Sequence, residues 1–156
     1  MKKAFTMIEL VFVIVILGIL AAVAIPRISG VTHDAEIAKG QADVATVRSA
    51  IMNERQTQLI KGTTTYIPTL SNSNTKLFTG NGTRTLMQYG VKAGTSSGKW
   101  QRIVDNAGVS APNTGYTDSY NYRVGTSVNV FDYNGTTGSK GEFVCSSGTQ
   151  CTELTE

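Results

Sequence analysis

An almost unbroken apolar run near the amino terminus constrains this chain more than any other feature of its sequence. The segment from Phe5 to Ile25 contains two polar residues, Thr6 and Glu9, and it has none from Leu10 to Ile25. As an α-helix this run extends about 31 Å, which matches the hydrocarbon core of a bilayer. Two lysines precede the run and favour a cytoplasmic amino terminus, so the rest of the chain is expected across the membrane.

The apolar run has three competing interpretations. It is a secretory signal peptide ending near Ala22-Val23-Ala24, a permanent anchor, or an anchor that also assembles subunits. Glu9 distinguishes among them, because a carboxylate at the centre of a span costs about 2.5–3.5 kcal/mol and somewhat less near its end. A signal peptide or a plain anchor gains nothing from that cost, whereas an intramembrane acid with a partner indicates a functional site.

Cleavage between Ala4 and Phe5 would create a partner for Glu9. The new α-amine on Phe5 would have a pKa of about 7.7–8.0 and would be mostly cationic at neutral pH. Opposite charges about 4 Å apart attract by roughly 4 kcal/mol at an effective dielectric of 20. The amine of one subunit could thus neutralise Glu9 of a neighbour and set the axial stagger of the helices. Pairing within one chain is the alternative, since the two groups lie about one helical turn apart.

These residues resemble the type IV pilin and type II secretion pseudopilin family. The resemblance rests on the stretch from Lys2 to Leu10, on the apolar run and on Ala24-Ile25-Pro26. It implies that a prepilin peptidase cuts between Ala4 and Phe5 and methylates the new amino terminus of Phe5. It also implies that Glu9 is the acid needed for assembly. The family usually has Gly where this chain has Ala4, and we expect cleavage after this slightly larger residue to be slower.

The resemblance also implies a function. The chain is expected to be a structural subunit of a type IV pilus-like filament or of a secretion or transformation pseudopilus, and not an enzyme; its compact head slightly favours a pseudopilus. The implied partners are other subunits in a homo-oligomeric or mixed pilin filament, the prepilin peptidase, the inner-membrane assembly platform and membrane lipid. The head is expected in the periplasm and later in a periplasmic or extracellular filament. The alternative is a secreted or membrane-anchored periplasmic binding module that does not polymerise.

The sequence predicts an α+β fold in which a long amino-terminal helix packs on a small antiparallel β-sheet head. We divide the chain into a leader at 1–4, a transmembrane and polymerisation helix at 5–25, an amphipathic continuation of that helix at 26–62, and a β-rich head at 63–156. The division follows the change from apolar to turn-rich composition along the chain.

The helix is expected to be weak at Gly18 and to kink at Pro26, which removes a backbone donor. Beyond this point two stripes recur at spacings of three and four residues, which places each stripe on one helical face. The first comprises Ile28, Val31, Ala35, Ala38, Ala42, Ala45 and Met52, and the second Ile37, Val44, Val47 and Ile51. Two stripes favour two contacts, one with the head and one with neighbouring subunits.

The head is expected to contain three or four antiparallel strands. Residues 119–124 and 127–133 are strand-like and are separated by Gly125-Thr126, a hairpin signal. Further strands are predicted at 99–104, where Trp100 and Ile103 are core candidates, and at 142–145. Residues 71–82 are expected to form a loop and 85–89 a short helical turn.

The two cysteines, Cys145 and Cys151, are expected to form a disulfide, because an even count in an exported chain favours one. A metal pair would need further ligands, and the single histidine, His33, is distant in sequence. No metal site is therefore assigned.

No catalytic residue or cofactor is assigned, since the chain has no Walker loop, nucleophile elbow, CxxC or HExxH motif. Major pseudopilins bind calcium near the carboxy terminus, which makes the acids of this region weak candidates, although their spacing matches no calcium loop. These acids are Asp105, Asp118, Asp132 and Glu142.

The formal net charge is +3, from 14 Lys and Arg against 11 Asp and Glu. This excess is small and spread along the chain. The sequence therefore predicts no direct nucleic-acid site, which would need Lys and Arg clustered on one face.

Overall fold

The computed structural model describes residues 5–104, 112–136, 138 and 140–156, and only the backbone of 25–29. The leader at 1–4, including Ala4, and the calcium candidate Asp105 lie outside the described residues. The chain forms two compact units, Met1–Ala35 and Glu36–Glu156.

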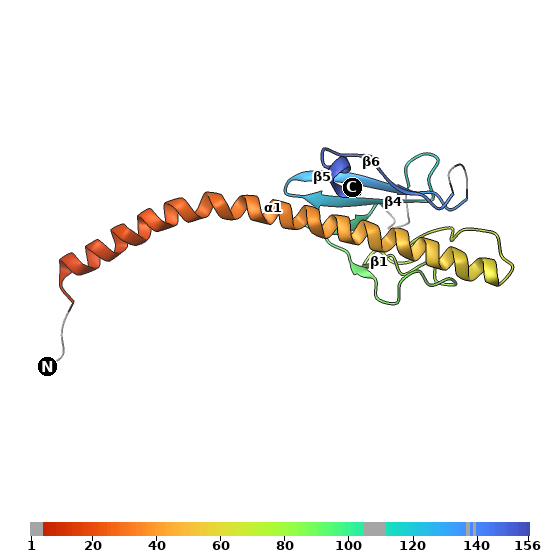
Figure 1. Ribbon diagram of the computed structural model, residues 1–156, viewed down its shortest axis with the longest axis horizontal. Helices are drawn as coiled ribbons and strands as arrows, with labels where there is room; N and C mark the ends of the chain where they lie inside the picture. The colour runs from red at the N-terminus through yellow and green to blue at the C-terminus, as the bar shows by residue number, and fades with distance from the viewer. Residues whose placement is uncertain (1–4, 105–111, 137, 139) are drawn as a thin grey trace. The chain divides into compact units, whose positions relative to one another are not determined.

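Helix α1, Met7–Ile60, begins in the first unit and continues into the second (Figure 1). Its backbone is helical without interruption through Gly18 and Pro26. The kink expected at these two residues stays a prediction. Within the first unit, Met7–Ala24 is long and apolar enough to cross a membrane. All of its side chains are exposed, so the described part of this unit contains no core of its own.

The carboxy-terminal end of α1 is closed by a glycine. Gly62 has φ 78°, a left-handed conformation that glycine adopts without a steric penalty. Its N–H donates to the carbonyl of Leu59 at 3.0 Å, and the N–H of Thr63 donates to the carbonyl of Gln58 at 2.8 Å. These bonds satisfy the last helical carbonyls in the manner of a Schellman motif, and the helix ends at Ile60, two residues before the predicted boundary at 62.

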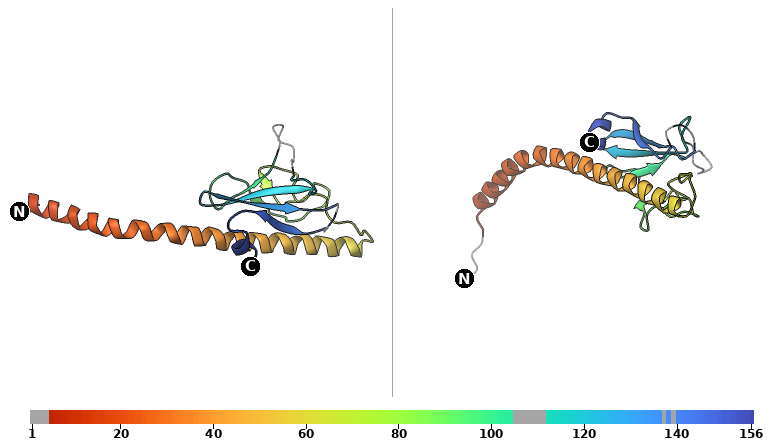
Figure 2. Two further views of the ribbon diagram at one scale, coloured as in Figure 1. Left: turned by 90° about the horizontal axis from the view of Figure 1, so that it is seen from above. Right: turned by 45° about the vertical axis from the view of Figure 1, so that its right-hand side comes forward.

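The second unit contains one antiparallel sheet of four strands in the order β3-β4-β5-β6. The strands are β3 (Trp100–Arg102), β4 (Asp118–Val124), β5 (Ser127–Tyr133) and β6 (Phe143–Ser147). Figure 2 shows this sheet in two further views. A long helix with a small antiparallel sheet confirms the α+β, pilin-like layout.

Within the second unit, one face of α1 packs into the core. Val44, Val47 and Ile51 are buried, and Ile37 is partly buried against the same cluster. This is the second stripe predicted from the sequence. The first stripe lies exposed on the helix surface from Ala38 through Met52. One stripe is therefore packed within the chain, and the second contact, with neighbouring subunits, stays a prediction.

Aromatic side chains fill the space between helix and sheet. Tyr120 and Tyr122 alternate inward along β4, and both are fully buried. The Trp100 ring lies 4.7 Å from the Tyr122 ring, and Phe78 lies 4.7 Å from Tyr120, measured between ring centroids. Such pairs contribute about 0.5–1.5 kcal/mol each beyond the area they bury. Trp100 is thus a core residue, as predicted, whereas Ile103 is only partly buried.

Three short elements differ from the expectation. The region predicted as a loop contains β1 (Lys76–Leu77), which pairs antiparallel with β2 (Val91–Lys92) to form a two-stranded ribbon. No helical turn forms at 85–89; Thr85 instead bridges Gly80. A carboxy-terminal helix, α2 (Cys151–Thr155), was not predicted. Elements this short have no hydrophobic period for a sequence reading to detect.

Candidate assembly site

Glu9 lies in the first turn of α1, where Thr6 is the residue that caps the helix. The main-chain N–H and the hydroxyl of Thr6 both donate to Oε2 of Glu9, at 2.9 and 2.7 Å. The N–H of Glu9 reaches back to Oγ1 of Thr6 at 3.4 Å. This reciprocal pattern is a capping box, which satisfies two backbone donors that a helix start otherwise leaves unpaired.

The capping box uses only one oxygen of the carboxylate. Both Thr6 bonds end on Oε2, and no hydrogen bond within the described residues reaches Oε1 of Glu9. The box therefore fixes the carboxylate in place while leaving a second acceptor for another donor. The role of Thr6 was not predicted, although the spacing Thr-x-x-Glu before an apolar run is the recognised signal for this motif.

Phe5 precedes the cap and is 83% exposed. Its position next to Thr6 places the start of the proposed mature chain beside the Glu9 carboxylate of the same chain. Pairing of amine and acid within one chain and pairing between chains both remain compatible with this arrangement. Ala4, on the other side of the predicted cut, lies outside the described residues.

The helix that follows this site is apolar on every side. Leu10, Phe12, Leu17 and Leu20 are each at least 58% exposed, and a β-carbon added to Gly18 would meet nothing within 4 Å. A surface of this kind is stable in lipid or against other apolar helices, and not in water. Glu9 is the acidic residue of this otherwise apolar segment.

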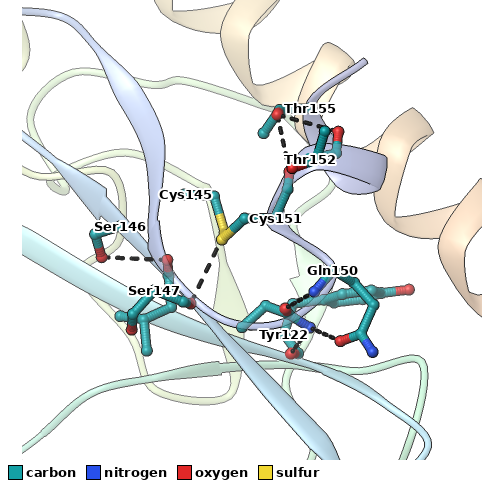
Figure 3. The surroundings of a disulfide bond; sticks show 10 residues. Tyr122, Cys145, Ser146, Ser147, Gln150, Cys151, Thr152 and Thr155 are labelled. Atoms are coloured by element: carbon teal, nitrogen blue, oxygen red, sulfur yellow. Dashed lines mark hydrogen bonds between the residues drawn. A yellow bond between two sulfur atoms is a disulfide. The ribbon is translucent and has the colours of Figure 1, made fainter.

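In the second unit, the predicted disulfide is confirmed. Cys145 of β6 and Cys151 of α2 are bonded, with their Cα atoms 5.5 Å apart (Figure 3). The bond holds α2 at the end of the sheet. Gln150, which precedes α2, exchanges hydrogen bonds with Asn129 of β5 at 3.0 and 3.1 Å. Gln41 of α1 also donates to the carbonyl of Glu153 at 2.7 Å.

A buried acid joins the sheet to the segment that follows α1. Asp118 Oδ1 accepts a bond from Nε of Arg102 at 2.7 Å, and Oδ2 accepts from the N–H of Leu70 at 2.9 Å and the hydroxyl of Tyr120 at 2.7 Å. Asp118 is fully buried. Burial and then the charge of Asp118 raise the pKa of Tyr120 well above its usual range. Asp118 is thus a structural anchor, a role that sequence reasoning missed.

The calcium candidates do not gather into one site in the described part of the chain. Asp118 is engaged as above, and Asp132 accepts hydrogen bonds from the Asn113 amide at 3.0 Å and from the Ser119 hydroxyl. Among the described residues, no group of three or more His, Cys, Asp and Glu side chains is arranged to hold a metal ion. Calcium binding stays a prediction.

Polar contacts also fasten α1 to the head. Oδ2 of Asp43 accepts bonds from the Trp100 indole at 2.9 Å and from Lys39 at 3.0 Å. Further along the helix, Glu54 of α1 forms a two-pronged ion pair with Arg84 of the head, and both N–O distances are 2.6 Å. This double geometry is the strong form of the arginine–carboxylate contact. All of these contacts lie within the second unit, and they hold the buried stripe of α1 against the sheet.

Comparison with known proteins gives the amino-terminal segment its family. Residues 1–25 match the family model described as the prokaryotic N-terminal methylation motif. The type IV narrow pilus major component PilA5 of Thermus thermophilus is 54% identical over 48 residues. This amino-terminal segment is that of the type IV pilin-like family. The similarity to PilA5 covers 31% of this chain and 41% of that protein, so the chain spans less than half of this curated relative. No solved structure matches the chain.

The pilin-like segment includes Phe5, Thr6 and Glu9, the residues of the capped helix start. The family resemblance stated from the sequence is therefore confirmed. The cut after Ala4, the methylation of Phe5 and the assembly role of Glu9 stay predictions. The relative is named as a pilus component, and pilins as a family are structural subunits. That this chain is not an enzyme stays a prediction.

Proposed function

We propose that the chain is a structural subunit of a type IV pilus-like filament. The observation that carries this proposal is the pilin-like helix start, in which a capped carboxylate precedes an apolar helix with every side chain exposed. Such a helix needs lipid before assembly and other helices after it. A monomeric periplasmic binding module would need neither the acid nor its fixed orientation.

The proposed assembly begins with cleavage by a prepilin peptidase between Ala4 and Phe5. The Thr6 N–H is an amide in both forms of the chain, so the capping box survives the cut. The cationic amine of Phe5 on one subunit then approaches the Glu9 carboxylate of a neighbour, where Oε1 is the acceptor that Thr6 does not use. With this partner, Glu9 is no longer an isolated charge in apolar surroundings. The attraction between the two charges compensates for the cost of burying them.

The exposed stripe of α1 supports a second contact in the filament. Ala38, Ala42 and Ala45 leave a smooth, small-residue surface on the helix, opposite the stripe that is buried on the sheet. Small side chains let helices approach closely. We propose that this stripe packs against helices of other subunits, in a homo-oligomeric or mixed filament.

A pilus is favoured over a secretion or transformation pseudopilus. The Thermus thermophilus relative is named as the major component of a type IV narrow pilus. The proposed location follows from this function: the helix lies in the inner membrane before assembly, with its amino terminus cytoplasmic and its head periplasmic. The inner-membrane assembly platform then passes the subunit into the filament.

Replacement of Glu9 tests the proposal. The Glu9→Leu variant is expected to insert into the membrane and to be cut before Phe5, yet to form few or no filaments. Glu9→Gln keeps the capping bond and removes the charge, so it separates the electrostatic role from the structural one. An exposed acid on the same helix, Asp34, provides the matched control in Asp34→Asn. Normal filaments from Glu9→Leu, or purified protein that still carries residues 1–4, would overturn the proposal.

A further inference from the structure

Basic residues are concentrated in one stretch of the chain, which includes the β1–β2 ribbon of the head. Residues 55–104 contain no Asp or Glu, although half of the 14 Lys and Arg residues lie there. They are Arg55, Lys61, Lys76, Arg84, Lys92, Lys99 and Arg102. The arginines are engaged, because two form ion pairs and one lies over the Tyr66 ring. The ion pairs found among the described residues include none of these four lysines.

Two of these lysines face one another across the ribbon. Lys76 of β1 is the register partner of Lys92 of β2, and both side chains are exposed. Like charges directly opposite in an antiparallel pair repel and destabilise it. Lys99 adds a third charge, since its side chain lies against Gly94, two residues beyond Lys92. Lys76, Lys92 and Lys99 form what we call the lysine patch, and an anionic partner would relieve its repulsion.

The same head carries negative charge at its carboxy-terminal helix. Residues 141–156 contain no Lys or Arg. Glu153 and Glu156 are three residues apart in and just after α2, which places them on one helical face, and both are exposed. We call this pair the glutamate patch. The disulfide and the buried side chain of Leu154 hold α2 in place, so the patch is already ordered before any partner binds.

The two patches lie at opposite edges of the sheet. β1 contacts β3 at one edge, whereas α2 contacts β6 at the other. The views in Figures 1 and 2 agree, with β1 and α2 on opposite sides of the part of α1 within this unit. Complementary surfaces on different faces of one subunit make a head-to-tail contact, and a contact of this kind extends into an open polymer when its rotation does not close a ring.

We infer that the glutamate patch of one copy docks on the lysine patch of a second copy and sets the register between neighbouring heads. The inference rests on the proposed filament function. Charge pairs at an interface contribute more to orientation and partner choice than to affinity, and exposed pairs contribute little to stability. The head contact therefore selects the rotation between subunits, while the apolar helices hold the filament together.

Charge reversal in the full-length chain tests this contact. The double variants Lys76→Glu/Lys92→Glu and Glu153→Lys/Glu156→Lys are each expected to lower the filament yield about tenfold, because each juxtaposes like charges. The variant that combines all four changes is expected to return to within about twofold of the unchanged protein, since it restores opposite charges with their positions exchanged. Lys61→Glu/Lys140→Glu makes the same change in net charge at exposed lysines outside the patch, and we expect it to assemble normally.

Two further measurements make the outcome unambiguous. Cleavage before Phe5 and the thermal unfolding of the head are expected to be unchanged in all four variants. If the unchanged protein forms no filaments, the proposed function fails; if it assembles and both reversals assemble equally well, only this inference fails. The inference is also overturned if the lysine variant assembles poorly, the glutamate variant assembles normally, and the combined variant does not recover. Retention of a DNA oligonucleotide by the unchanged protein would then assign the lysine patch to a polyanion.

Discussion

The side chain of Leu154 occupies the space that a β-carbon on Gly40 would need. Such a β-carbon would also lie 2.6 Å from a ring carbon of Tyr122. Gly40 is buried in the middle of α1, where glycine is less stable than alanine by about 0.5–1 kcal/mol. Close packing of α2 and β4 on the helix backbone at Gly40 compensates for this loss.

Gly40→Ala is therefore expected to destabilise the head, despite the better helix propensity of alanine. Overpacking of a filled core costs about 1–3 kcal/mol, which outweighs the gain in propensity. Thermal unfolding in detergent measures the change. Gly30→Ala is the control, because nothing lies within 4 Å of its added β-carbon, and we expect no loss there. Equal or higher stability of Gly40→Ala would show that α2 does not pack as described.

Thr6→Val is expected to loosen the first turn of α1. The change keeps the side-chain shape but removes the hydroxyl that bonds the N–H and the carboxylate of Glu9. Loss of a helix cap costs about 1 kcal/mol, so the amides of the first turn should exchange with solvent about fivefold faster in micelles. Thr6→Ser keeps the hydroxyl and should exchange at the original rate. Identical exchange in all three proteins would contradict the capping box.

Asp118→Asn is expected to be among the most damaging single changes in the head. It leaves the guanidinium of Arg102 buried without its anion, and breaking one side of a buried ion pair costs about 3–5 kcal/mol. Chemical denaturation measures this loss. Asp34→Asn removes an exposed carboxylate and should have little effect. A small loss in Asp118→Asn would show that the acid is not the anchor of this segment.

Alkaline pH is expected to unfold the head through its buried tyrosines. Burial raises the pKa of Tyr120 and, together with the charge of Glu54, that of Tyr133. Because the unfolded side chains ionise at the usual tyrosine pKa of 10.0, the stability is fully present below that pH and falls as the pH rises through the folded pKa. Denaturant midpoints measured between pH 8 and about 12 report the slope.

Tyr133→Phe removes one ionisable group and should flatten this slope, whereas Tyr89→Phe, at a position 85% exposed, should leave it unchanged. Tyr133→Phe also loses the hydroxyl bond to the Ile67 carbonyl, so it should lower stability at neutral pH by about 1 kcal/mol. The slope and the neutral-pH offset are thus separate readouts. A slope that is the same in both variants would contradict the role of buried Tyr133.

The parts of the fold that sequence reasoning predicted are those with a repeated local signal. The hairpin of β4 and β5 has alternating apolar residues around Gly125-Thr126, and both strands were predicted within one residue of their ends. The two stripes of α1 were also distinguished from their spacing, and one of them is the face buried in the core. Each of these signals needs only neighbours along the chain.

The features that were missed depend on residues far apart in sequence. The acid at position 118 reads as a surface residue until Arg102 and the N–H of Leu70 are brought to it by the fold. The opposition of Lys76 and Lys92 requires the register of two very short strands, which no period reveals. Thr6 is different, because its capping signal was present in the sequence and was not used.

The way in which Asp118 holds its loop has a consequence for how the exterior of such a protein can change. The carboxylate accepts hydrogen bonds from the main-chain N–H groups of Leu70 and Ser71. These main-chain groups are the same whichever side chains the residues carry. The exposed side chains that follow Ser71 in this loop can therefore change over generations without loosening the anchor. A fibre made of these units could alter what an immune system or a bacteriophage encounters while its scaffold stays as it was.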